Sequence, residues 1–493
     1  MPPQKEPQEE PQQEPQQEPK EESQQEPQGE PQQEPQEEWD RTVLSRRRQL
    51  FVLGFLMLAG LLNYLDRASL SIANPVIRRD LGLTGTQMGS LLAAFSITYG
   101  LGQIPAGTLV KRFGFRRVLG GSMLGWSAAQ MTTSLVRSYP AFQALRAVLG
   151  FGEAPFFPAI LDAVQTSFPP QRRARALSFV NASTILGTAL APPALTVLML
   201  WSGWRGMFAA IGAAGMVLAA TWLLVGIRIG GTRSSGSTRI GRSPEPSTSP
   251  ENFASPLSFR SLFADPALLA LLRTRTMWGM MLGFGGINYT AWLYLTWLPG
   301  YLASQFHLKL GATGILSGIP FAAGAVGMLA SGALTDLKAR GPLNPMTYRR
   351  NLIVTGMLLS AASTALVVRA TSLSMAIAAI SMAVLFIHFA GTAAWNLIPV
   401  VSSFPSLSPI LSPSLSPQIG ALQNMGSYAI ASAGPILTGW LLDRTHSFHT
   451  ALLICSGVTA AGALAYLTLT SKPISIGPLP HGDVRRSQTR ASQ

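Results

Sequence analysis

The feature that most constrains this chain is a series of long apolar segments joined by short connections. Each is about long enough to cross the roughly 30 Å of hydrocarbon in a bilayer. Inside a bilayer, a single segment satisfies its own backbone hydrogen bonds only as a helix. The sequence therefore predicts an all-α membrane protein with twelve transmembrane helices, at 50–73, 87–109, 118–136, 141–165, 174–199, 204–226, 276–303, 312–334, 351–369, 372–396, 417–440 and 448–471.

Composition agrees with a membrane protein. Hydrophobic residues make up 47% of the 493 residues and charged residues only 12%, about half the fraction usual in soluble proteins. The net charge of +14 would also suit a soluble nucleic-acid binder, but such a protein does not carry repeated apolar spans. We therefore expect a lipid bilayer as the surrounding partner and no nucleic acid.

Polar segments divide the chain into five regions. Residues 1–38 repeat Gln-Glu-Pro units with a net charge of −10, a composition typical of disorder, and 228–262 is a basic Gly/Ser/Pro-rich loop. A Ser-Pro run at 402–417 is interpreted as a lengthened loop without an assigned role. The predicted regions are a cytoplasmic tail with a basic flank (1–49), an N-terminal six-helix bundle (50–226), a cytoplasmic linker (227–267), a C-terminal six-helix bundle (268–471) and a cytoplasmic tail (472–493).

Lysine and arginine are concentrated on alternate connections. If both termini lie in the cytoplasm, the inner loops and helix ends hold 26 Lys and Arg residues, besides two in the acidic tail, and the outer loops hold seven. Excess positive charge marks the cytoplasmic side of a membrane protein. We therefore expect a multi-pass protein of the cell (inner) membrane with both termini in the cytoplasm.

An internal repeat supports two similar halves. Residues 101–112 read LGQIPAGTLVKR and residues 326–337 read VGMLASGALTDL. Both copies lie at the cytoplasmic end of the second predicted helix of their half. Three pairs match at one offset of 225 residues: Gly102 with Gly327, Gly107 with Gly332, and Leu109 with Leu334.

Charged residues inside predicted spans are the best functional candidates. With a rise of 1.5 Å per residue, Asp66 and its neighbour Arg67 lie roughly 24 Å from the inner end of their span. In the fourth span, Arg146 lies roughly 8 Å and Glu153 roughly 18 Å from the outer end. Adjacent residues on a helix point in different directions, so Asp66 and Arg67 need not pair with each other. An Asp66–Arg146 pair between the two helices is geometrically possible and is a hypothesis.

Two interpretations of these charges remain open. They either neutralise one another and hold two helices together, or the carboxylates carry protons while an arginine binds an anionic solute. Burial penalises the charged form of a carboxylate, which makes Glu153 a candidate proton carrier. Arginine stays charged and offers a planar fork matched to a carboxylate.

Weaker candidates are polar aromatics and amides in the spans, which either bind solute hydroxyls or join helices. They include Tyr64, Tyr99, Trp395 and Asn424. The sequence has no Walker-type Gly-Lys-Ser/Thr loop and no His/Cys cluster with metal-ligand spacing. We therefore expect no enzyme activity, no metal, and no cofactor beyond a proton or sodium gradient.

Five motifs resemble those of the major facilitator superfamily, and within it the anion:cation symporter branch. They are NYLDRASLSIANP (63–75), FSITYGLGQIPAGTLVKRFGFRRV (95–118), ALRAVLGFGEAPFFPA (144–159), TWLPGYL (296–302) and ALQNMGSYAIASAGPILTGWLLDRT (421–445). The resemblance covers roughly 50–471. It implies alternating access between two six-helix bundles, and proton-driven uptake of organic anions such as hexuronates, aldonates or aldarates.

The resemblance also implies roles for single residues. In bacterial members the acids of helices 1 and 4 serve proton coupling, which here are Asp66 and Glu153. The helix 1 arginine contacts the substrate carboxylate and matches Arg67. Positions that match further family residues are Arg146 in helix 4, Tyr99 in helix 2 and Asn424 in helix 11.

Two positions depart from the family pattern. The loop between helices 2 and 3 usually carries an Asp within Gly-x-x-x-Asp-Arg-x-Gly, whereas here Lys111 stands between Gly107, Arg112 and Gly114. The second-half copy keeps Gly332 and Asp336, so we place all six in a conformational motif. In helix 5, Thr184 replaces a Gln that is common in sugar-acid members.

The sequence thus predicts a monomeric secondary active transporter for proton-coupled uptake of a small organic anion, with a sugar acid preferred. The predicted substrate-binding residues are Arg67, Tyr64, Tyr99, Arg146, Trp395 and Asn424. The alternatives are a facilitator or proton-coupled exporter of another solute, such as a drug or an aromatic acid, and a membrane sensor that does not transport.

Overall fold

The computed structural model describes residues 45–226, 266–337, 344–402 and 416–474, and within them it contains helices and no strands. These residues belong to one compact unit. The acidic tail, most of the linker, most of the Ser-Pro run and the last residues lie outside the described part, so the predicted domain boundaries stay a prediction. Side chains of a few helical residues, Lys111 and Asp336 among them, are also outside it.

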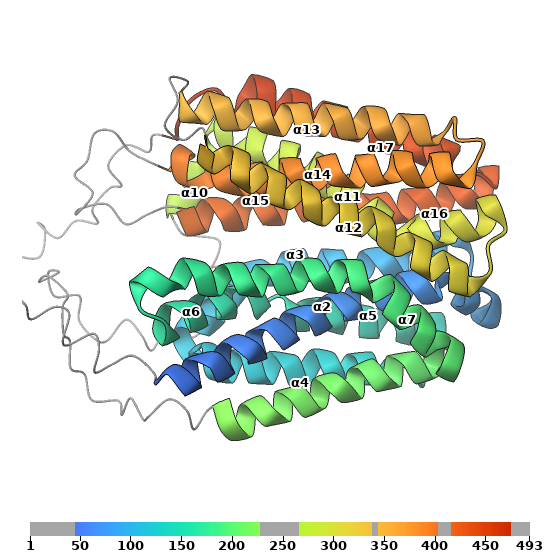
Figure 1. Cartoon of the computed structure of the whole chain (residues 1–493), viewed down its shortest axis with the longest axis horizontal. Coiled ribbons are helices and arrows are strands. Elements are labelled where there is room, and N and C mark those ends of the chain that lie inside the picture. Colours follow the sequence, from blue (N-terminus) through green and yellow to red (C-terminus); the bar gives the residue numbers. More distant parts are fainter. Residues whose placement is uncertain (1–44, 227–265, 338–343, 403–415, 475–493) are drawn as a thin grey trace, which may run out of the picture. The chain divides into compact units, whose positions relative to one another are not determined.

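The helices of the first half run from residue 46 to 226 (Figure 1). They are α2 (Arg46–Leu81), α3 (Gly85–Phe113), α4 (Phe115–Thr133), α5 (Tyr139–Glu153), α6 (Phe156–Ser167), α7 (Pro170–Thr221) and the short π-helix η1 (Trp222–Gly226). Those of the second half are α10 (Pro266–Leu272), α11 (Arg275–Phe306), α12 (Leu310–Leu337), α13 (Pro345–Val367), α14 (Leu373–Val401), α15 (Ser416–Ala431), α16 (Ala433–Thr445) and α17 (His449–Leu469).

Each of the twelve predicted spans coincides with helical residues, and the breaks have local causes. The fourth span divides into α5 and α6 at Pro155, and the eleventh into α15 and α16 near Pro435, because proline lacks the N–H that continues a helix. Helix α7 covers the fifth and sixth spans with a break at Gly203, whose φ of 68° and ψ of 174° suit a residue without Cβ.

Seven helical stretches of the described residues are long and apolar enough to cross a membrane, judged by length and composition alone. The pair α5–α6 and the long α7 each count as one stretch among these seven. The structure therefore confirms an almost entirely helical fold with several apolar spans. The count of twelve spans is consistent with it and stays a prediction.

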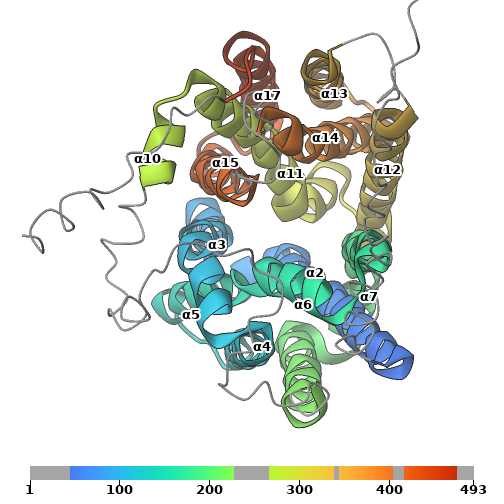
Figure 2. The same ribbon diagram turned by 90° about the vertical axis from the view of Figure 1, so that its left-hand side faces the viewer.

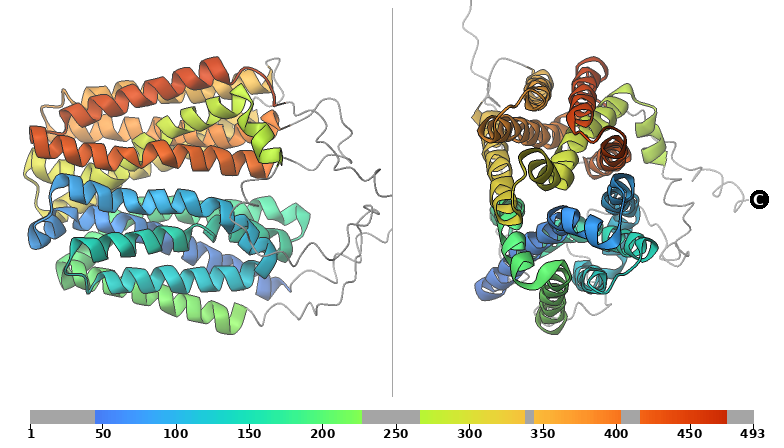
Figure 3. Two further views of the ribbon diagram at one scale, coloured as in Figure 1. Left: turned by 180° about the vertical axis from the view of Figure 1, so that it is seen from behind. Right: turned by 90° about the vertical axis from the view of Figure 1, so that its right-hand side faces the viewer.

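The two halves form two groups of helices that face each other. Figure 2 shows the helices of the first half gathered around α2, and those of the second half around α11. The views from behind and from the opposite end show the same division (Figure 3). The groups meet where α7 contacts α12, α3 contacts α15 and α16, and α2 contacts α11.

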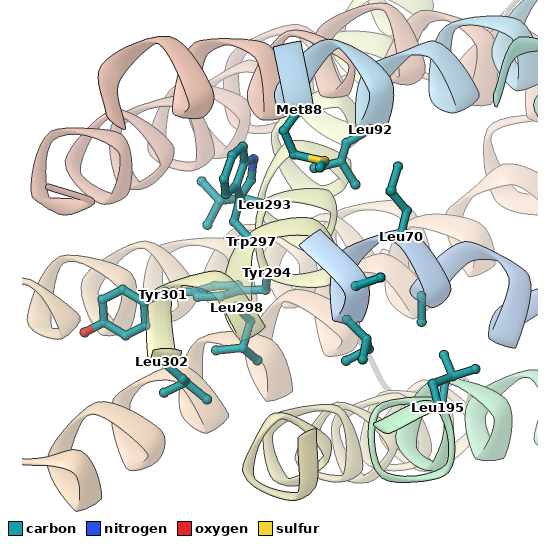
Figure 4. Close-up of a cluster of buried hydrophobic side chains, with 14 of the residues drawn as sticks. Leu70, Met88, Leu92, Leu195, Leu293, Tyr294, Trp297, Leu298, Tyr301 and Leu302 are labelled. Carbon is teal, nitrogen blue, oxygen red and sulfur yellow. The ribbon is translucent and has the colours of Figure 1, made fainter. Parts of the chain in front are cut away.

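A cluster of buried apolar side chains joins the halves near one end of this interface. Leu70, Met88 and Leu195 come from the first half and belong to one cluster with Leu293 and Trp297 of α11 (Figure 4). Leu83, which lies in the turn between α2 and α3, belongs to the same cluster. The halves are therefore packed together at the end that holds this turn, which we call the outer end because the sequence predicts it outside the cell.

Candidate functional site

Four charged side chains are buried together between α2 and α5. Asp66 and Arg146 are each 1% exposed, Arg67 is 5% exposed and Glu153 is completely buried. Asp66 and Arg67 lie in the middle part of α2, while Arg146 is the central residue and Glu153 the last residue of α5. Two acids and two arginines share this place, so the cluster is formally neutral.

Arg67 and Glu153 form the central ion pair of this cluster. The Arg67 Nε donates a hydrogen bond of 2.9 Å to Glu153 Oε2. Glu153 is the last residue of α5, directly before the break at Pro155. The break therefore fixes the depth at which this carboxylate meets α2.

Aromatic rings surround the Arg67 guanidinium. Its Cζ lies 4.6 Å from the ring centre of Tyr99 and 5.2 Å from those of Tyr64 and Phe95. A planar cation is stabilised on aromatic faces, more strongly where water is absent. The rings and Glu153 together hold the guanidinium in one orientation.

Asp66 and Arg146 do not form the pair that the sequence suggested. The structure pairs Arg67 with Glu153 instead, and within the described residues neither Asp66 oxygen has a hydrogen-bond partner. Arg146 packs over Phe95 at 5.3 Å, and its Nε and Nη1 are likewise without partners there. The hypothesis of an Asp66–Arg146 ion pair was therefore wrong: the ion pair between the two helices joins Arg67 to Glu153.

A cavity of about 230 Å³ lies between the two halves and reaches Arg67. Among the described residues that line it, Arg67 is the one with a permanent charge. The first half contributes Tyr64, Arg67, Thr184, Ile185 and Thr188, and the second half contributes polar and aromatic residues that include Asn288, Trp292, His388, Thr392, Trp395 and Tyr428. The wall is thus one cation, several hydroxyl and amide groups, and aromatic faces.

The six predicted substrate-binding residues fall into two groups. Tyr64, Arg67 and Trp395 line the cavity. Tyr99 lies behind them, with its ring 5.1 Å from that of Tyr428, while Arg146 and Asn424 do not line it. Their roles in substrate binding are not decided by this placement and stay predictions.

Helix α14 supplies cavity residues that the sequence did not single out together. His388, Thr392 and Trp395 line the cavity from this helix. Their spacing of four and three residues places them on one helix face. A polar stripe at helical spacing in an otherwise apolar span was the available signal. His388 is held by a contact of 2.8 Å between Nδ1 and the Val384 carbonyl oxygen.

The predicted conformational motif is described only in part. Gly114 ends α3 with φ of 75°, and the Arg112 guanidinium lies over Phe113 at 5.5 Å. Gly107 and Gly332 both have open space where a Cβ would stand. The side chains of Lys111 and Asp336 are outside the described part, so the consequence of lysine at position 111 is not tested.

Two facing groups of apolar helices around a central cavity are the architecture of a membrane transporter. The family model for the Major Facilitator Superfamily matches residues 56–408, more than half of the chain. The chain belongs to the major facilitator superfamily. Members of this family are transporters and not enzymes, which confirms those two expectations.

Relatives with assigned substrates cover nearly the whole chain. The probable L-galactonate transporter of Escherichia coli (strain K12) is 42% identical over 436 residues, 88% of this chain and 92% of that protein. The hexuronate transporter of Bacillus subtilis (strain 168) is 27% identical over 84% of this chain and 93% of its own length. The probable galactarate/D-glucarate transporter GarP of E. coli (strain K12) is 29% identical over 83% and 92%. These relatives agree with the expected anion:cation symporter branch.

A solved structure agrees in fold. A bacterial homologue of the human lysosomal transporter Spinster, in an inward-facing and unoccupied conformation, has a TM-score of 0.68 over 88% of this chain and 100% of that chain. Its sequence identity is 18%, so this likeness concerns the fold alone.

Proposed function

We propose that this protein takes up a small organic anion, a sugar acid, in symport with protons. The support for the substrate class is the set of relatives, which are named for L-galactonate, hexuronate and galactarate/D-glucarate. L-Galactonate is the first substrate to test, because the relative named for it is 42% identical.

The observation that carries the proposal is that Arg67 belongs both to the cavity wall and to the buried ion pair. It lines the cavity, and it is also ion-paired with Glu153 at 2.9 Å. A solute carboxylate in the cavity and the Glu153 carboxylate therefore compete for one guanidinium. A proton on Glu153 would remove that competitor and favour anion binding, and a bound anion would favour protonation of Glu153, because linkage is reciprocal. This arrangement couples one anion to one proton.

The remaining cavity wall suits the hydroxylated carbon chain of a sugar acid. Thr188, Asn288 and Thr392 supply hydroxyl and amide groups. Trp292 and Tyr428 supply aromatic faces, with their ring centres 6.0 Å apart. Apolar walls with a few placed polar groups are typical of small-molecule sites. In this proposal Arg67 binds the carboxylate, and the second half selects the rest of the solute.

The proposed setting is the inner membrane of a bacterial cell, with both termini in the cytoplasm and a monomer as the functional unit. The support is the excess of Lys and Arg on the predicted inner loops. Transport would alternate between opening at the inner and at the outer end.

Glu153→Gln tests the coupling. In proteoliposomes with an imposed pH gradient, we expect this variant to lose uphill accumulation of labelled L-galactonate and to retain counterflow. The amide keeps the shape of the side chain but cannot take up and release a proton as a carboxylate does. The control is Asp162→Asn. Asp162 is an acid of α6 that does not line the cavity and pairs with neither arginine of the cluster.

Uphill accumulation that persists undiminished in Glu153→Gln would refute its coupling role. Flux of L-galactonate that ignores the gradient in the unmodified protein would favour a facilitator. Binding without any flux would favour a sensor, and flux of an aromatic acid or drug in place of L-galactonate would favour the exporter alternative.

A further inference from the structure

A second cavity of about 480 Å³ lies at the outer end of the interface between the halves. It shares no lining residue with the central cavity. Its walls come from α2, α11 and α16, from Leu83 in the turn after α2, and from Phe448 directly before α17. Because α2 belongs to the first half and α11 to the second, this outer cavity is complete only while the outer ends are together.

An unused hydrogen-bond donor lies in the wall of the outer cavity. Asn74 is 1% exposed, and its Nδ2 has no hydrogen-bond partner among the described residues. It lies next to Gly300 of α11, where a Cβ would come 3.7 Å from Nδ2 and 3.8 Å from Trp297 Cε3. The missing side chain leaves space beside the amide. A buried N–H without an acceptor costs free energy, which a ligand oxygen would recover.

Two arginines add positive charge to the same wall. Arg78 and Arg79 both line the outer cavity, and no acid is among the described residues that do so. Acids lie behind them, with Asp443 3.8 Å from Arg78 and Asp80 3.6 Å from Arg79. The Arg78 Nε also donates a hydrogen bond of 3.5 Å to the Leu83 carbonyl oxygen. A guanidinium has five N–H donors, so these contacts still leave donors for another acceptor. The polar groups that face the cavity are thus chiefly donors.

We propose that the outer cavity is a second anion site, which binds the carboxylate of a small organic acid between Asn74 and the two arginines. The arginines attract the anion, the Asn74 amide fixes one oxygen, and the Trp297 ring covers the apolar part. The anion is either the transported sugar acid at the outer mouth or an unrelated carboxylate. Only the choice of L-galactonate as a probe rests on the proposed function.

The experiment separates the two sites by removing the central one. Arg67→Met/Glu153→Gln removes both members of the buried ion pair and leaves the net charge of the cluster unchanged. Equilibrium dialysis of this purified full-length variant with labelled L-galactonate, and separately with labelled acetate, is expected to show one remaining binding site for at least one of the two anions. Retention of both probes would identify a general carboxylate site, and retention of L-galactonate alone would identify a station for the transported anion.

Further substitutions locate the remaining site. Adding Asn74→Leu or Gly300→Leu should weaken it about tenfold or more, because the first removes the donor and the second fills the space beside it. Arg369→Gln, which removes an exposed arginine that does not line the cavity, should leave it unchanged. As a second arm, Gly300→Leu in the otherwise unmodified chain should reduce the stoichiometry from two anions to one.

Two results would overturn the proposal. One is the absence of L-galactonate and acetate binding in the folded double variant together with one anion per unmodified chain. The other is remaining binding that Asn74→Leu, Gly300→Leu and Arg78→Gln all leave intact. Loss of transport without loss of acetate binding would count against the proposed function and leave the outer site standing.

Discussion

Helix α2 contributes an arginine to each of two ion pairs, and these pairs differ in nearly every other respect. Arg67 meets Glu153 at 2.9 Å, with side chains only 5% and 0% exposed. About three turns further on, Arg78 meets Asp443 at 3.8 Å, with both side chains 29% exposed. The first pair lies inside one half of the protein. The second connects the two halves at the outer end.

Asp443 does more than approach Arg78. Its carboxylate accepts hydrogen bonds from the backbone N–H of Gly85 at 2.6 Å and of Thr86 at 2.7 Å, and from the Thr86 hydroxyl at 2.7 Å. Gly85 and Thr86 begin α3, and a helix N-terminus favours a negative charge. An acid at the end of α16 therefore caps a helix of the opposite half.

The two ion pairs respond differently to a motion of one half relative to the other. A motion of one half relative to the other leaves the Arg67–Glu153 pair intact, because both residues move together. The same motion must break the contacts of Asp443 before the outer end opens. The buried pair is thus suited to bind the anion and the proton, and the outer contacts are suited to hold one conformation.

The largest expected effect comes from breaking the buried pair. Arg67→Ala should raise the Kd for L-galactonate about a hundredfold or more, because the anion loses its cation and Glu153 is left buried without a partner. Calorimetric titration of the purified protein measures it. Arg78→Ala removes the arginine of the outer pair and should change the Kd for L-galactonate at the central cavity no more than about twofold. Equal effects of the two substitutions would contradict the comparison.

An intermediate effect is expected at the outer contact. Asp443→Ala should shift the equilibrium toward an open outer end by about 1–2 kcal/mol, since it removes charge-assisted hydrogen bonds that are partly exposed to water. The measurement is the modification rate of a cysteine at Met88, a buried position of the outer cluster, in a Cys455→Ser background. The rate should rise about tenfold.

Asp80→Ala is the matched control for that experiment. Asp80 also lies at the outer end and accepts a hydrogen bond of 3.0 Å from the Trp204 indole, but both residues belong to the first half. Its removal should leave the modification rate at position 88 unchanged. A rise as large as that of Asp443→Ala would show that the effect is general loosening and not the loss of a contact between the halves.

The smallest effect is expected from added salt, which tests the same comparison between the exposed and the buried ion pair. Raising the ionic strength from 0.1 M to 1 M shortens the Debye length from about 10 Å to about 3 Å, which weakens exposed pairs and hardly affects buried ones. The modification rate at position 88 should rise by about twofold, a change of a few tenths of a kcal/mol. Salt dependence that persists in the Asp443→Ala variant would place its origin elsewhere.

Much of the architecture follows from the sequence. The twelve apolar spans coincide with helices because a bilayer leaves the backbone no other way to satisfy its hydrogen bonds. The burial of Asp66, Arg67, Arg146 and Glu153 was also predictable, because charges are rare in such spans and their depth follows from the rise of a helix. The break at Pro155 follows from proline chemistry.

The partners of these charges were decided by the tertiary structure. Asp66 and Arg67 are neighbours, so a small rotation of α2 selects which of them faces Glu153, and apolar patterning around a buried helix does not fix that rotation. Trp395 was predicted from the sequence, but its place beside His388 and Thr392 in one cavity wall also depends on how α14 packs. Asp443 looked like an acid at a helix end, and its role as a cap on α3 arises only from the docking of the two halves. Sequence alone therefore determined which charges are buried, and packing between helices determined which of them meet.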